Sequence, residues 1–184
     1  GREVVPPESH PFNEYGYLAG TQAWIAQYLA VYDRALDDPA ASQLAERIMN
    51  YNMFEIEYNE PDGRFKPSKG VGAGPLREKN QYAHFHTHAM NILGALYTAR
   101  ETGNQVLFDR GLKSYEWARD NGEPLVGFFP MVTYDEYVGA QTSETCEVTD
   151  MVHVAIMLSK LGIDRWDDAD RWCRNQLAEN QHTT

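Results

Sequence analysis

The apolar residues of the chain recur at the spacing of amphipathic helices. This periodicity predicts six helices, at 17–36, 40–57, 81–102, 105–121, 143–161 and 165–181. The first, third and fifth segments are apolar on all sides, whereas the second, fourth and sixth have one apolar stripe and a charged face. A helix that is apolar all round has to be covered on every side. The pattern therefore predicts an all-α fold in which inner and outer helices alternate.

Short helix-stopping segments separate the two members of each helix pair. They centre on Asp37, Gly103 and Gly162, which lie 66 and 59 residues apart. This spacing predicts three antiparallel helical hairpins with a repeat of about 60 residues, as in curved or closed helical arrays. A plain six-helix bundle accounts for the same pattern and is the alternative.

Two long connections join the predicted hairpins, at 58–80 and 122–142. The first holds seven Gly or Pro residues, and the second mixes Gly and Pro with aromatic residues such as Phe128. Connections longer than about 15 residues within a compact domain are usually functional or disordered. In an array of antiparallel hairpins, both connections and the N-terminal ends of the inner helices lie at one end. We expect the functional site at that end.

Composition and charge narrow the class of protein. The chain has 184 residues, of which 42% are hydrophobic, so we expect one globular domain over 1–184 with an extended N-terminal segment at 1–15. Its net charge of −11 disfavours nucleic acid as a partner. No run of about 18 apolar residues occurs, so neither a membrane span nor an intact signal peptide is predicted.

Three of the six histidines fall within five residues, at His84, His86 and His88. His84 and His88 are four residues apart and would share one helical face, where they could bind one metal ion or one sugar hydroxyl. Core filling is the alternative for any single histidine. The aromatic residues Tyr82 and Phe128 are expected at the same end and suit stacking on sugar rings.

A second cluster begins the fifth predicted helix. Glu144 and Glu147 are explained in part by the helix dipole, which favours acidic residues in a first turn. Glycoside hydrolysis needs paired carboxylates, and Glu144 is the better catalytic candidate. Cys146 is either a soft metal ligand or a buried structural residue, while Asp150 and His153 are spaced to pair with each other. The two cysteines of the chain form no CxxC pair and do not fix the redox compartment.

Several segments together resemble a known family. They are DGRFKPS at 62–68, HFHTHAM at 84–90, ARETGNQVLFDRGLKSYEWARDNG at 99–122, GFFP at 127–130 and SETCEVTDM at 143–151. Over residues 15–182 the chain resembles the six-hairpin (α/α)6-toroid glycosidases, in particular the β-L-arabinofuranosidase-like glycoside hydrolases. The SETC sequence is the most specific element of this resemblance.

The resemblance implies a zinc site. In that family a Glu-Thr-Cys motif at the start of an inner helix supplies zinc ligands, and a later cysteine is the nucleophile. Glu144 and Cys146 would be the ligands here, and the histidine-rich segment would line the sugar site. The chain departs from the family because it ends before a later cysteine segment, because Cys173 lies within an outer helix, and because it supplies three of six hairpins.

These departures indicate part of a longer enzyme or a reduced relative. Half a toroid leaves the flanks of its inner helices uncovered, so we expect self-association or packing against the rest of a larger chain. The leading prediction is a glycoside hydrolase-like domain that binds carbohydrate and is weak or inactive in isolation. The alternatives are a sugar isomerase or epimerase, with histidines as acid and base, and a non-catalytic helical scaffold that binds a protein partner.

Overall fold

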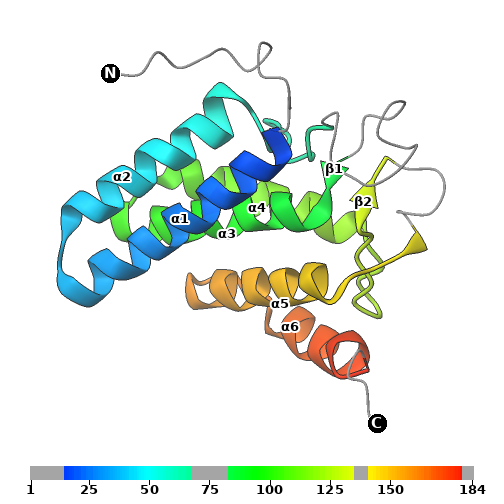
Figure 1. Cartoon of the computed structure of the whole chain (residues 1–184). Coiled ribbons are helices and arrows are strands. Elements are labelled where there is room, and N and C mark those ends of the chain that lie inside the picture. The colour runs from blue at the N-terminus through cyan, green and yellow to red at the C-terminus, as the bar shows by residue number, and fades with distance from the viewer. Residues whose placement is uncertain (1–14, 68–82, 135–140, 180–184) are drawn as a thin grey trace, which may run out of the picture.

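The structure, a computed structural model, describes residues 15–67, 83–134 and 141–179. Six α-helices lie in these ranges and confirm the all-α prediction (Figure 1). They are α1 (Tyr15–Leu36), α2 (Pro39–Asn50), α3 (Phe85–Thr102), α4 (Gln105–Asp120), α5 (Thr145–Lys160) and α6 (Trp166–Trp172). One π-helical turn extends α2 over Tyr51–Glu55, and another extends α6 over Cys173–Leu177. The predicted N-terminal extension lies outside the described residues, except for Tyr15, which begins α1.

The three turns within the hairpins share one backbone conformation. Asp37, Gly103 and Gly162 all have positive φ angles, of 55°, 70° and 94°. The left-handed conformation ends each first helix and reverses the chain. The second helix of the first two pairs is then capped by a side chain: Asp38 accepts from the backbone N–H of Ala40, and Asn104 accepts from that of Leu107. The three turn positions that the sequence predicts are therefore structurally equivalent.

Helix α3 lies at the centre and contacts α1, α2, α4 and α5 (Figure 1). Helix α1 approaches it with a row of small buried residues, Ala19, Ala23, Ala26 and Ala30. Gly94 of α3 permits this approach, because a Cβ atom there would lie 2.8 Å from Met49 Sδ and 2.9 Å from the Ala23 carbonyl oxygen. Helices α3 and α5 are buried on most sides, as predicted for inner helices. Helix α1, which the pattern also predicts to be inner, instead exposes large apolar side chains such as Tyr28.

The second half of the core is aromatic. Its largest buried side chains are Phe65, Phe85, Tyr115, Phe129 and Trp172. Phe65 comes from the connection after the first hairpin, and Phe129 comes from the connection after the second. Each long connection therefore contributes a buried aromatic side chain to the core, which is not expected of a free linker.

A short sheet joins the two connections at one end of the helices. Strand β1 (Ala83–His84) pairs antiparallel with β2 (Val132–Thr133), with Ala83 opposite Thr133 and His84 opposite Val132. The sequence predicts helix from residue 81, but the pairing keeps 83–84 extended and α3 begins at Phe85. His84 consequently becomes the N-cap residue of α3 and not a residue of its first turn.

A buried ion pair joins the second and third hairpins. The Asp168 carboxylate accepts hydrogen bonds from Arg119 Nε at 2.8 Å, from Arg119 Nη2 at 3.1 Å and from the Tyr115 hydroxyl at 2.8 Å. Burial alone would raise the pKa of Asp168, but the hydrogen bonds from Arg119 and Tyr115 outweigh it and lower the pKa. The folded protein therefore holds this group ionised more strongly than the unfolded chain does.

Replacing Asp168 should weaken the fold in a pH-dependent way. Because the folded pKa lies below the unfolded value of about 4, the stabilisation is present above that pH and is lost as the pH falls through the folded pKa. We expect Asp168→Asn to lower the free energy of unfolding by about 2 kcal/mol at neutral pH. Urea unfolding at pH 7 and in acid, near the folded pKa, measures this difference, which should shrink in acid. The control is Asp170→Asn, which removes an exposed ion pair with Arg174 and should change the free energy of unfolding by about 0.3 kcal/mol. An equal loss of stability in the two variants would contradict the prediction.

Candidate functional site

The polar residues of interest meet where α3 and α5 begin, beside the β1–β2 pair (Figure 1). His84 is the N-cap residue of α3, and Glu144 is the N-cap residue of α5. Glu147 Oε2 accepts a hydrogen bond from the Glu144 backbone N–H at 2.9 Å, as in a capping box. The two helix ends thus hold an imidazole and two carboxylates in fixed positions.

His84, Glu144 and Glu147 form a group that could hold a metal ion. Each offers one ligand atom, and these atoms lie within 4.8 Å of one another. His84 Nε2 is 3.9 Å from Glu144 Oε2. Glu147 is fully buried, and its Oε1 atom has no hydrogen-bond partner among the described residues. A buried carboxylate oxygen without a donor is costly, and a cation in this group would satisfy it.

The electrostatics of the group suit a cation. Burial raises the pKa of Glu147 to about 7, and the nearby Glu144 carboxylate adds to the rise. Burial lowers the pKa of His84, and the neighbouring His86 lowers it further. His84 is therefore a neutral imidazole, which is the form that ligates metals. A cation would also relieve the repulsion between the two carboxylates.

A histidine–aspartate pair lies next to this group. His86 Nδ1 is 2.6 Å from Asp150 Oδ2, and this hydrogen bond raises the pKa of His86 against the opposing effect of burial. The ring of Trp24 meets the His86 ring edge-on, with centroids 5.9 Å apart. The predicted pairing of Asp150 with His153 is wrong, because His153 Nε2 instead hydrogen-bonds the Tyr97 hydroxyl at 2.8 Å.

His88 belongs to the core. Its ring is stacked between Tyr58, at a centroid distance of 3.8 Å, and Phe65, at 4.5 Å. Burial lowers the pKa of His88 well below its usual range, so the ring is neutral. The described cation-binding group contains His84 but not His88. The expected shared face of these two histidines is broken, because His84 precedes the first turn of α3.

Cys146 lies against the two carboxylates. Its Sγ atom is 3.4 Å from Glu144 Oε2 and 3.5 Å from Glu147 Oε2. Burial and then the Glu147 charge raise the pKa of Cys146 to about 12, so the thiol keeps its proton at neutral pH. Of the two ligands that the resemblance implies, the cation-binding group includes Glu144 and leaves out Cys146. Cys173 packs against the core at the end of α6.

Of the two aromatic candidates, the structure describes only Phe128. Phe128 is partly buried and lines a surface pocket of about 330 Å³ with Thr133 and Tyr134. Tyr82 lies outside the described residues. The ring that contacts His86 is that of Trp24 on α1. The sequence does not single out Trp24, because nothing in its spacing relates it to residues about 60 positions later.

Comparisons of the chain with protein-family models, with curated proteins and with solved structures gave no match. The resemblance to the glycosidase toroids therefore stays a prediction. Among the described helices, none is both long and apolar enough to span a membrane.

Proposed function

We propose that this chain is a glycoside hydrolase-like domain that binds carbohydrate where α3 and α5 begin, with a zinc ion held by His84, Glu144 and Glu147. The observation that carries the proposal is the convergence of these three side chains beside the His86–Asp150 pair. One imidazole and two carboxylates form a donor set that Zn²⁺ accepts. The orphaned Oε1 atom of the buried Glu147 supports a cation at this place.

The surrounding residues have distinct proposed roles. A bound zinc ion would act as a Lewis acid toward a sugar oxygen. His86 is held in one orientation by Asp150 and is the group we assign to proton transfer. Glu144 is exposed and is the carboxylate that a sugar can reach.

The helical architecture is compatible with this proposal. The three hairpins α1–α2, α3–α4 and α5–α6 are units of the kind from which an α/α toroid is built. A six-hairpin ring needs as many again, together with the walls and the cysteine nucleophile that they carry. We therefore expect carbohydrate binding by this chain but weak hydrolysis or none in isolation.

Sugar binding tests the proposal directly. In the presence of zinc, titration with arabinofuranose-containing oligosaccharides should give saturable heat. Glu144→Gln and His86→Ala should each weaken binding about tenfold or more, because each removes a hydrogen-bonding group that is charged or charge-assisted. His153→Ala, whose ring hydrogen-bonds Tyr97, is the matched control and should bind normally. Unchanged binding in both site variants would contradict the proposal.

A sugar epimerase is the second candidate, and one observation favours it. Only one imidazole joins the cation-binding group, and the His84 and His86 rings stand perpendicular with centroids 6.0 Å apart. Two such imidazoles could serve as acid and base on one sugar. Incorporation of solvent deuterium into a free aldose, lost in His86→Ala, would favour the epimerase, and release of sugar from an oligosaccharide would favour the hydrolase.

A further inference from the structure

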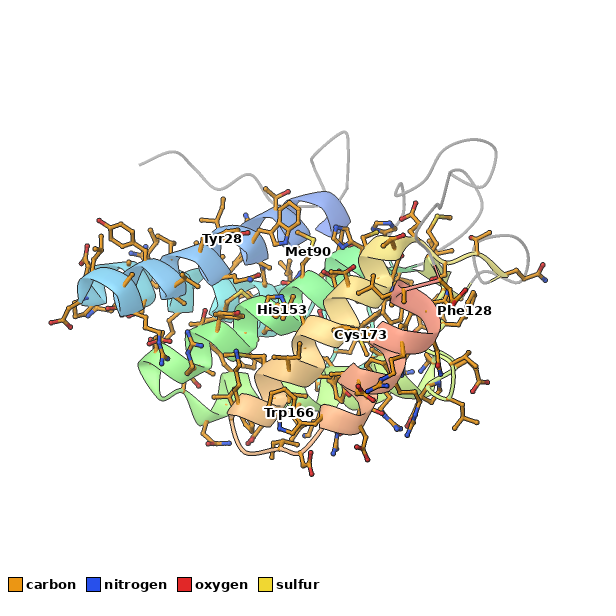
Figure 2. All side chains as sticks on the ribbon, turned by 90° about the horizontal axis from the view of Figure 1, so that it is seen from below. Tyr28, Met90, Phe128, His153, Trp166 and Cys173 are labelled. Atoms are coloured by element: carbon orange, nitrogen blue, oxygen red, sulfur yellow. The ribbon has the colours of Figure 1, made fainter. Side chains whose placement is uncertain are left out.

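Helix α1 has two apolar faces, and the described structure covers only one of them. Its alanine face packs on α3, as described above. The opposite face, here called the outer face of α1, carries six large apolar side chains that are 39% to 65% exposed. They are Trp24, Ile25, Tyr28, Val31, Tyr32 and Leu36. Figure 2 shows Tyr28 on α1 at the edge of the molecule away from α6.

From this face we infer that two copies of the chain associate through α1. The six side chains together expose on the order of 600 Å² of apolar surface, which is at the upper end for a single patch on a monomer. A stable dimer buries about 800 Å² on each partner. The outer face with a narrow polar rim is therefore large enough for a dimer interface, and a 22-residue helix is long enough to present it.

Charge favours a second copy as the occupant. The chain carries a net charge of −11, so most approaches of one copy to another are repulsive. Helix α1 does not add to this repulsion, because Asp33 and Arg34 are its only charged residues, their charges cancel, and neither belongs to the outer face. An apolar face is also self-complementary, as a two-fold interface requires. A basic partner would be drawn to the acidic remainder of the surface and not to this helix.

The proposed dimer interface lies beside the candidate site, but dimerisation does not require the site to bind zinc or sugar. Trp24 begins the outer face and its ring contacts His86 at the other edge. A second copy packed on α1 would shield one side of the histidine pair from solvent. The inference rests on exposure, area and charge, so it stands or falls separately from carbohydrate or zinc binding.

Sedimentation velocity from about 1 to 100 µM tests this inference, since interfaces of this size commonly have micromolar or tighter Kd values. We expect the unmodified chain to reach twice its mass of 21.0 kDa. Tyr28→Lys should stay at the mass of one chain, because it places a charge at the centre of the outer face. Val106→Lys is the matched control, because Val106 is equally exposed but lies on α4, and it should dimerise normally.

Two results would overturn the inference. One is a single-chain mass for the unmodified protein at the highest concentration, which would leave the outer face for another occupant such as a further hairpin of a longer chain. The other is a two-chain mass that persists in both Tyr28→Lys and a second variant, Ile25→Glu. Circular dichroism accompanies each variant, and because both side chains are at least half exposed we expect the helical signal to be retained.

Discussion

Replacing Trp172 with alanine should lower the free energy of unfolding by about 4 kcal/mol. Trp172 is fully buried, and its ring meets Phe129 edge-on at a centroid distance of 4.9 Å. Its indole N–H donates to the Pro124 carbonyl oxygen at 2.8 Å. Gly127 lies against the ring with a φ of 84°, and because it has no side chain it cannot fill the space that the ring leaves. One side chain thus joins α6 to the connection after α4.

Urea unfolding followed by circular dichroism measures this loss. The control is Trp166→Ala, because Trp166 begins the same helix but is half exposed, and we expect a change below about 1 kcal/mol. Similar destabilisation by the two variants would show that the aromatic cluster around Trp172 does not anchor the third hairpin.

Zinc affinity should fall about 100-fold or more when either His84 or Glu147 is replaced. His84→Ala removes the only imidazole of the group, and Glu147→Gln removes the buried carboxylate whose Oε1 atom is otherwise without a partner. We expect a large effect because each replacement removes one of only three protein ligands to the zinc ion. Competition with a chromophoric chelator at constant pH measures the affinity of each variant.

The matched controls separate this group from its neighbours. His88 lies four residues after His84 but its ring is in the core. The folded His88→Gln variant should therefore bind zinc with the affinity of the unmodified chain. Cys146→Ser should have a smaller effect than His84→Ala, because the thiol contacts the carboxylates from outside the group. A loss in Cys146→Ser as large as that in His84→Ala would indicate the Glu-Thr-Cys ligand set of the resemblance instead.

The fold could be predicted because its signals are local. Helical periodicity depends on neighbouring residues, and the turns at Asp37, Gly103 and Gly162 are set by the residues that adopt positive φ most readily. Most helix boundaries came within two residues, and the exceptions are the start of α3 and the ends of α2 and α6, beyond which the chain continues as π-helical turns to Glu55 and Leu177. The start of α3 was displaced because β1 pairs with β2, and a strand partner 50 residues away leaves no trace in the local pattern.

The site could be predicted only in part. Periodicity tells which residues share a face of one helix, but it does not give the rotation of that helix against its neighbours. The histidine cluster and Glu144 were found by composition and position, whereas the pairing of His86 with Asp150 depends on how α3 and α5 pack. The packing of Tyr58 and Phe65 on α3 assigns His88 to the core, and the packing of α1 on α3 brings Trp24 to His86.

The central claim is that a cation is held where α3 and α5 begin by His84, Glu144 and Glu147. X-ray absorption at the zinc edge of the zinc-loaded chain tests it most directly. The account predicts a first shell of nitrogen and oxygen at about 2.0 to 2.2 Å, with an imidazole signature that disappears in His84→Ala. A first shell that contains sulfur at about 2.3 Å, or a chain that retains no zinc, would contradict the account.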